Sequence, residues 1–144
     1  MKLILLTNVF ATLFMVGLIW FVQIVHYPLF SSVGQKEFQR YEQMHQRLTT
    51  WVVGPAMLVE LATAFALLKF APGESQTLVW TGIVLVGVIW ISTATLSVPA
   101  HNSLTLEYTQ AAYDKLVRTN WIRTICWTAR GGLMLYLVDR LYSV

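Results

Sequence analysis

The sequence predicts an all-α protein, an up-down four-helix transmembrane bundle with two amphipathic interfacial connector helices on one membrane face. Two observations predict this class. Of the 144 residues, 56% are apolar and only 12% are charged, about half the charged share of a soluble domain. The apolar residues also gather into four long stretches, and the mean hydropathy is +0.59. The length supports one domain, residues 1–144.

The first stretch, residues 3–30, contains no Asp, Glu, Lys or Arg. About 20 apolar residues suffice to cross the hydrocarbon core of a bilayer, so we predict a membrane span here. A cleaved signal peptide is the alternative, because Lys2 precedes the apolar run. The run is too long for that reading and lacks a small-residue cleavage site.

Residues 35–48 have apolar side chains at helical spacing with polar residues between them, which predicts an amphipathic helix lying at the membrane interface. Residues 51–70 are apolar apart from Glu60 and a few hydroxyls, and form the predicted second span. Pro55 lies near its start and should kink the helix.

The turn residues of 71–76 predict a short connection to a third span at 77–98, which ends before Pro99. Residues 104–119 again have an amphipathic pattern, and 121–142 form the predicted fourth span. The order is thus span, amphipathic connector and span, a short turn, and then the same three elements again. It suggests an internal repeat of two helical hairpins in the same orientation.

In a four-span chain the first and third connectors lie on the same side of the membrane, which we call the connector face. All three histidines, His26, His45 and His101, are predicted to lie there. Six basic residues are also predicted on this face, against three on the other: Lys36, Arg40, Arg47, Lys115, Arg118 and Arg123, against Lys2, Lys69 and Arg140. The positive-inside rule therefore predicts a cytoplasmic connector face, in a bacterial inner membrane.

Two ionisable residues interrupt the spans at matching depth. Glu60 is the tenth residue from Trp51, and Arg130 is the tenth from Trp121. A rise of 1.5 Å per residue puts both roughly 14 Å below the connector face, near the middle of the bilayer. Such groups need a partner at that depth, so we predict a Glu60–Arg130 ion pair. It either belongs to a proton path or ligand site, or fixes the register of the helices.

Residues that bind metals or transfer protons near neutral pH are predicted to gather at the connector face. The candidate catalytic residues are His26, His45, His101 and Arg123, and the candidate ligand-binding residues are Gln23, Asn102 and Asn120, with Glu60 and Arg130 as the floor of the pocket. Histidines satisfied by water and backbone at the interface are the alternative.

Glu42 and His45 have the Glu-x-x-His spacing of carboxylate-bridged metal sites, which makes His26, His45, His101 and Glu42 candidate metal ligands. As a second alternative, His26 and His101 end diagonal spans and would ligate a haem from two sides. The cofactor is thus a metal ion or haem, or neither.

The strings FVQIVHYPLF, HQRLTTWVVGPAMLVELATA and TNWIRTICWTARGG cover residues 21–30, 45–64 and 119–132. In these strings the chain resembles a group of small bacterial four-helix integral membrane proteins that carries no assigned activity. In layout it is distantly similar to membrane proteins related to anthrone oxygenases. That similarity implies oxidation of an aromatic substrate with little cofactor, and we carry over no catalytic residues from it.

Two functions follow from these observations. The first is a membrane protein whose polar pocket binds a metal, haem, quinone or small aromatic ligand in redox chemistry. The alternative is a non-catalytic accessory or structural subunit of a larger membrane complex. The expected partners are the lipid bilayer and membrane proteins or further copies of this chain. Nucleic acid is not expected, because the 10 Lys and Arg residues form no basic run.

Overall fold

The computed structural model describes residues 1–142, which form four long helical rods. The first rod joins α1 (Lys2–Phe21), a π-helical segment (Val22–His26) and α2 (Tyr27–Phe30). The second is the continuous helix α3 (Gln35–Phe70). A 3₁₀ turn (Gly73–Ser75) leads into the third rod, which joins α4 (Gln76–Ser92), a π-helical segment (Thr93–Ser97) and α5 (Val98–Leu106). The fourth is α6 (Gln110–Tyr142).

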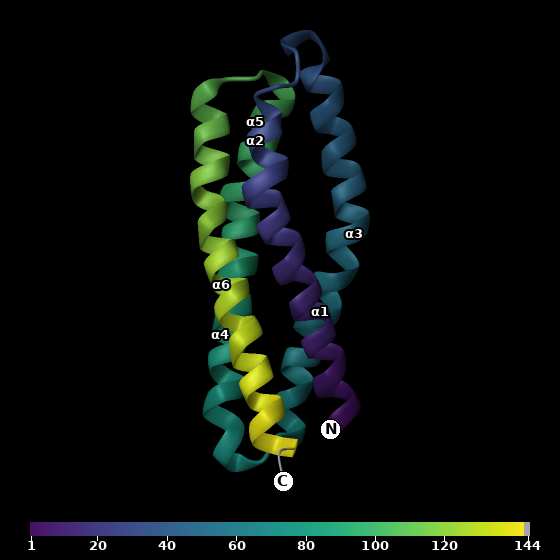
Figure 1. Cartoon of the computed structure of the whole chain (residues 1–144), viewed down its shortest axis with the longest axis vertical. Coiled ribbons are helices and arrows are strands. Elements are labelled where there is room, and N and C mark those ends of the chain that lie inside the picture. The colour runs from purple at the N-terminus through teal and green to yellow at the C-terminus, as the bar shows by residue number, and fades with distance from the viewer. Residues whose placement is uncertain (143–144) are drawn as a thin grey trace.

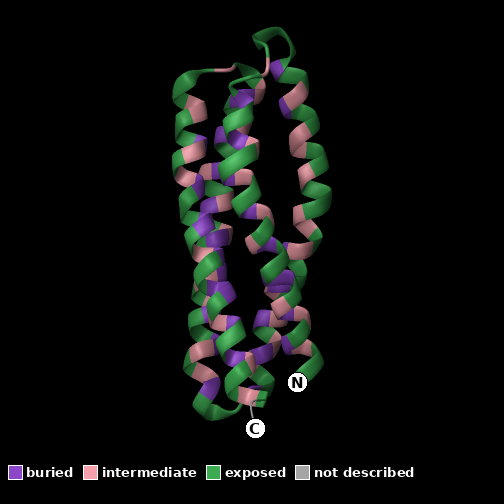
Figure 2. Ribbon diagram, viewed as in Figure 1, coloured by how far each residue is buried: buried purple, intermediate pink, exposed green. Residues whose placement is uncertain are grey.

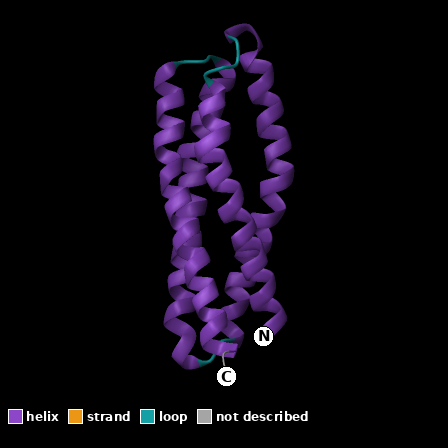
Figure 3. Ribbon diagram, viewed as in Figure 1, coloured by secondary structure: helices purple, strands orange, loops and turns teal. Residues whose placement is uncertain are grey.

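The rods run alternately up and down, as predicted (Figure 1). The loops at 31–34 and 107–109 lie at one end of the bundle, which we call the connector end, while the 71–75 connection lies with the N-terminus at the other. Figure 3 shows helix throughout the described chain apart from these short loops. The first and third rods lie diagonally opposite each other, because α1 packs on α3 and α6 while α4 packs on the same two helices.

The prediction of separate connector helices is wrong. Residues 35–48 continue into residues 51–70 as one helix, and residues 104–119 are divided between α5 and α6 by the loop at 107–109. The physical reason is that nothing between residues 48 and 51 stops a helix. The 36 residues of α3 extend about 54 Å at 1.5 Å per residue, well beyond a hydrocarbon core of about 30 Å. The amphipathic stretches are therefore the ends of the long rods.

Three rods are long and apolar enough to cross a membrane, namely Lys2–Phe30, Gln35–Phe70 and Gly73–Leu106. The fourth predicted span, 121–142, lies within α6 and does not reach the same apolar level. Its interior carries Arg123 and Arg130, and both are buried. The charges that make this helix less apolar are therefore turned into the bundle.

The two π-helical segments occupy equivalent places in the first and third rods. Each ends two residues before a proline, Pro28 in one case and Pro99 in the other. A proline has no backbone N–H to donate within the helix, and single π turns accommodate such a local change in hydrogen bonding. The first rod of each hairpin thus has a π-helical segment followed by a proline, which agrees with the predicted two-hairpin repeat.

Buried residues recur along the rods between exposed and intermediate ones (Figure 2). They make up three apolar clusters, one at each end of the bundle and one between them. The middle cluster contains Met15, Met57 and Trp127. The α1 and α6 backbones approach closely at Gly131, where an added Cβ would lie 3.1 Å from Val16 Cγ2. A residue without a side chain allows two helices to pack this closely.

Candidate functional site

The predicted ion pair between Glu60 and Arg130 is confirmed. Arg130 Nε donates to Glu60 Oε1 at 2.8 Å, and both side chains are 1% exposed. The other two guanidinium nitrogens donate to Asn8 Oδ1 at 2.9 Å and to the Gly82 carbonyl at 2.6 Å. The pair therefore joins the diagonal helices α3 and α6 and also ties in α1 and α4.

The Glu60 carboxylate is equally well satisfied. Thr12 donates to Oε1 at 2.7 Å, and the indole nitrogen of Trp127 donates to Oε2 at 3.0 Å. Every nitrogen and oxygen of the Glu60 and Arg130 side chains has a hydrogen-bond partner within the bundle. A closed network of this kind favours the register-fixing interpretation over the ligand-binding one.

A second polar cluster lies toward the connector end, where the three histidines meet. The rings of His26 and His45 are 4.5 Å apart between centroids, and those of His45 and His101 are 5.3 Å apart. Nε2 of His26 and Nδ1 of His45 share a hydrogen bond of 2.9 Å, and Thr49 Oγ1 lies 3.1 Å from the same Nδ1. The histidines thus converge inside the bundle rather than turning outward, as a pocket requires.

A chain of hydrogen bonds runs from Arg123 to Glu42. His101 Nδ1 lies 2.5 Å from Glu42 Oε1, its Nε2 lies 3.0 Å from the Tyr27 hydroxyl, and Arg123 donates to that hydroxyl at 3.2 Å. A carboxylate only accepts, so Nδ1 of His101 carries a proton, and in the neutral form of the ring Nε2 accepts from Tyr27. All donors in the chain therefore point toward Glu42, which is fully buried.

Two amides hold Arg123 in place. Asn120 Oδ1 accepts a hydrogen bond from the same terminal nitrogen of Arg123 that donates to Tyr27. The Asn120 amide in turn donates to Gln23 Oε1 at 2.8 Å, and Gln23 donates to the Val117 carbonyl at 3.3 Å. Asn120 lies one helical turn before Arg123, which places both side chains on one face of α6.

A cavity of about 310 Å³ lies between the two polar clusters. Its wall is mostly apolar and includes Met15, Ile19, Met57, Trp90 and Trp127. Its polar lining includes four side chains of the histidine cluster and its hydrogen-bond chain: Tyr27, His45, His101 and Arg123. The site therefore combines an apolar body with a polar, hydrogen-bonding end.

The candidate residues divide into three groups. His45, His101 and Arg123 line the cavity. His26, Glu42 and Asn120 do not line it but bind residues that do, and Gln23 binds Asn120 behind them. Glu60 and Arg130 do not line the cavity, but Trp127 lines it and binds Glu60. Asn102 lies elsewhere, exposed in a shallow groove beside Arg47.

The metal-ligand hypothesis finds no matching geometry. Within residues 1–142, no group of three or more His, Cys, Asp or Glu side chains is arranged to hold a metal ion. The reason is visible in the hydrogen bonds, because His26 and His45 pair with each other and both ring nitrogens of His101 are engaged by Glu42 and Tyr27. The same hydrogen bonds engage both nitrogens of His101, so the arrangement does not favour the alternative of a haem held by His26 and His101.

Several side chains of the site were not predicted from the sequence, among them Tyr27, Gln46 and Trp90. Tyr27 links Arg123 to His101, Gln46 donates to both Glu42 and Thr105, and Trp90 lines the cavity. Tyr27 directly follows His26, so a regular helix would turn the two about 100° apart. Both nevertheless reach the cluster, His26 from the last residue of the π-helical segment and Tyr27 from the residue before Pro28.

Comparison with known proteins adds no relative, because no family model, curated protein or solved structure matches this chain. The resemblances drawn from the sequence strings therefore stay predictions. The function has to be argued from the geometry of the site.

Proposed function

We propose that this protein is an integral membrane protein that binds a small aromatic or quinone-like molecule in the cavity beside the histidine cluster. The observation that carries the proposal is the cavity itself, which pairs an apolar wall containing Trp90 and Trp127 with a polar end formed by Tyr27, His101 and Arg123. Small-molecule sites have this composition, a mainly apolar lining with a few convergent polar groups.

The outer surface supports the membrane location. In the apolar windows of the first three rods, only 33%, 22% and 28% of the residues are buried within the protein. Large apolar side chains such as Phe10, Trp80 and Ile91 are exposed on the outside. Water would make this surface costly, whereas hydrocarbon chains would not. We place α6 in the membrane as well, because its two buried arginines face inward.

The size of the cavity supports a small ligand. Sites for small molecules occupy about 300–1,000 Å³, and about 310 Å³ lies at the lower end of that range. A wall of this kind fits a ligand that has one aromatic ring or two fused aromatic rings. The polar end requires an oxygen-bearing head, because the free groups there include the N–H donors of Arg123.

The binding test uses 1,4-naphthoquinone and the purified protein in mild detergent, with quenching of tryptophan fluorescence as the signal. Val53 lines the cavity and is half-buried, so Val53→Phe should fill part of it and weaken binding by about tenfold. Val138→Phe is the matched control, because Val138 is also half-buried but lies outside the cavity. Equal quenching of both variants would contradict the proposal.

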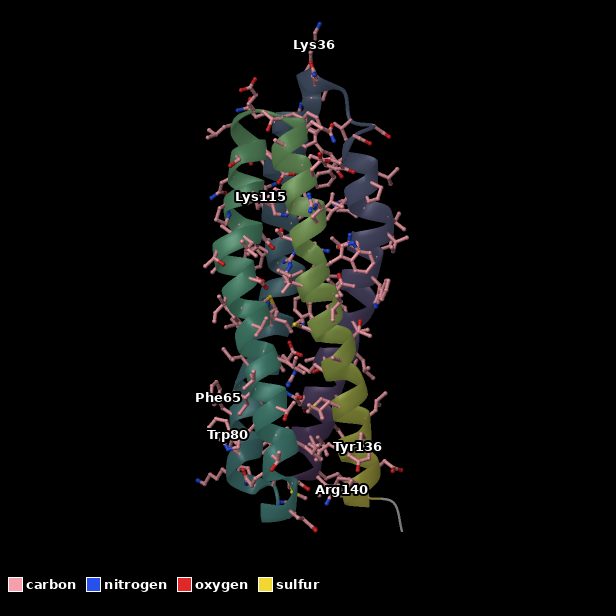
Figure 4. All side chains as sticks on the ribbon, turned by 90° about the vertical axis from the view of Figure 1, so that its left-hand side faces the viewer. Lys36, Phe65, Trp80, Lys115, Tyr136 and Arg140 are labelled. Atoms are coloured by element: carbon pink, nitrogen blue, oxygen red, sulfur yellow. The ribbon has the colours of Figure 1, made fainter. Side chains whose placement is uncertain are left out.

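The orientation is tested separately. We propose that the connector end faces the cytoplasm of a bacterial inner membrane, as the excess of basic residues there suggests. Figure 4 shows Lys36 near the connector end and Arg140 near the other. In a Cys126→Ala background, Lys36→Cys should resist a membrane-impermeant maleimide added to intact spheroplasts, while Glu74→Cys should react. The opposite labelling pattern would reverse the orientation.

A further inference from the structure

We infer that the ligand of this cavity carries a carboxylate, and that Arg123 is its counter-ion. This inference rests on the proposed function and names the chemical class of its ligand. The inference comes from comparing the two buried arginines of α6, which lie seven residues apart and differ in whether they pair with a carboxylate. Arg130 is paired with Glu60, whereas Arg123 forms no ion pair with any carboxylate in the described part of the chain.

The Arg123 side chain is buried, with only 8% of its surface exposed. Its hydrogen bonds to Tyr27 and Asn120 both come from one terminal nitrogen, Nη2. Nε is buried without any partner in the described residues, and the guanidinium has further N–H groups to donate. Nε is closed off from the cavity, so the donors that can meet a ligand there belong to the other terminal nitrogen, Nη1, which makes no hydrogen bond within the described residues.

The nearest carboxylate along the hydrogen bonds does not supply the missing charge directly. Glu42 is separated from Arg123 by both His101 and Tyr27, and its Oε1 already accepts from His101 and Gln46. An arginine that is buried without a counter-ion is costly to fold, because the charge leaves water without a compensating partner. A cavity beside it provides the place for an anion from outside the chain.

The rest of the cavity decides which anion fits. Inorganic anions are strongly hydrated and would leave the wall of Met15, Met57 and Trp90 without a partner. An apolar body bearing one carboxylate satisfies both ends, since arginine pairs with carboxylates through parallel hydrogen bonds. Aromatic acids and short fatty acids share this chemistry, so the two sources are separated by experiment.

The test compares acids with their neutral amides, which have the same shape. The probes are 2-naphthoate against 2-naphthamide, and decanoate against decanamide, titrated calorimetrically into the protein in a non-ionic detergent. We expect at least one acid to bind about tenfold more tightly than its amide, the preference typical of hydrogen bonds to a charged group. Naphthoate as the better acid identifies an aromatic ligand, and decanoate an acyl chain.

Variants assign the preference to the side chain. Arg123→Gln should bring the affinities of acid and amide to within about twofold of each other, and Arg123→Lys should keep part of the preference. Arg118→Gln is the matched control, because Arg118 is an exposed arginine on the same helix outside the cavity, and it should change neither affinity. This control removes one positive charge outside the cavity, so it shows how much of the preference for the acid comes from the net charge of the protein.

The outcomes separate the two proposals. Equal binding of acid and amide by the unmodified protein would overturn the carboxylate inference and leave the proposed binding function standing. Retention of the preference in Arg123→Gln would overturn the role of Arg123. Absence of binding by all four probes, together with no quenching by naphthoquinone, would overturn both proposals. The folding of Arg123→Gln is checked by its thermal unfolding without ligand, which should occur at the same or a higher temperature because an unpaired buried charge has been removed.

Discussion

The indole N–H of Trp127 donates a hydrogen bond to Glu60 Oε2 at 3.0 Å, and the same side chain forms part of the cavity wall. This contact makes one tryptophan the boundary between the closed polar network at the middle of the bundle and the cavity next to it. Trp127 therefore connects the two regions, although neither Glu60 nor Arg130 lines the cavity. Four predictions follow from this layout and from the packing around it.

Loss of the charge at Glu60 should destabilise the bundle strongly. Glu60→Gln leaves Arg130 buried without its counter-ion, and breaking a buried pair from one side costs about 3–5 kcal/mol. The free energy of unfolding in detergent and denaturant measures this loss. Glu74→Gln, at an exposed acidic residue of the short connection, should change stability little. A Glu60→Gln variant as stable as the parent would mean that the pair does not fix the bundle.

Two glycines of α4 should respond to alanine in opposite ways. At Gly82 an added Cβ would lie 2.7 Å from Arg130 NH1, whose guanidinium is held by several hydrogen bonds, whereas at Gly87 nothing lies within 4 Å. Overpacking should make Gly82→Ala less stable by about 1–3 kcal/mol. Gly87→Ala should be neutral or more stable by up to about 1 kcal/mol, because alanine favours the helix. Thermal unfolding of the two variants side by side checks this contrast.

The two cavity tryptophans should also differ. Trp127→Phe removes a donor to the buried Glu60 carboxylate and should cost about 1–3 kcal/mol, whereas the Trp90 indole nitrogen is buried with no hydrogen-bond partner in the described residues. Trp90→Phe removes an unsatisfied donor at the cost of some packing and should change stability by less than about 1 kcal/mol. Unfolding curves without ligand measure both. Equal losses would show that the indole hydrogen bond of Trp127 is unimportant.

The hydrogen-bond chain predicts the tautomer of His101. With Glu42 accepting from Nδ1, the neutral ring should be protonated at Nδ1 and not at Nε2. Nitrogen-15 NMR of histidine-labelled protein distinguishes the two tautomers by their chemical shifts. Glu42→Gln should remove this fixed preference, while Glu37→Gln, at an exposed residue of the same helix, should leave the His101 signals unchanged. An Nε2-protonated ring in the parent protein would reverse the direction of the chain.

Much of the fold could be predicted from local patterns. Long uncharged stretches and the turn residues at 71–76 place the rods, and a simple count of residues from Trp51 and Trp121 pairs Glu60 with Arg130. The connector helices were predicted wrongly, because an amphipathic pattern does not distinguish a separate interfacial helix from the end of a longer one. Helix continuity depends on whether a breaker interrupts the chain, and α3 has none between residues 48 and 51.

The sequence predicts that the three histidines lie at one end of the bundle but does not predict their hydrogen bonds. The topology brings the three histidines to one end of the bundle, whereas the pairing of His101 with Glu42 and Tyr27 depends on helix rotation at the π-helical segments. A π turn rotates the residues that follow it around the helix axis, and a sequence pattern based on 3.6 residues per turn does not reveal this rotation. The sequence analysis also made Arg130 part of the pocket floor, whereas Arg123 lines the cavity and Arg130 does not.

The diagonal position of Glu60 and Arg130 has a consequence for biosynthesis. During synthesis the first hairpin leaves the ribosome with Glu60 in its second rod, while Arg130 is still to be made. Until α6 arrives, the carboxylate has only the hydroxyl of Thr12 from the first hairpin to bind. A hairpin with an unpaired acid is unfavourable in hydrocarbon. In the membrane location proposed above, the first two rods should therefore stay beside the insertion machinery until the last rod arrives.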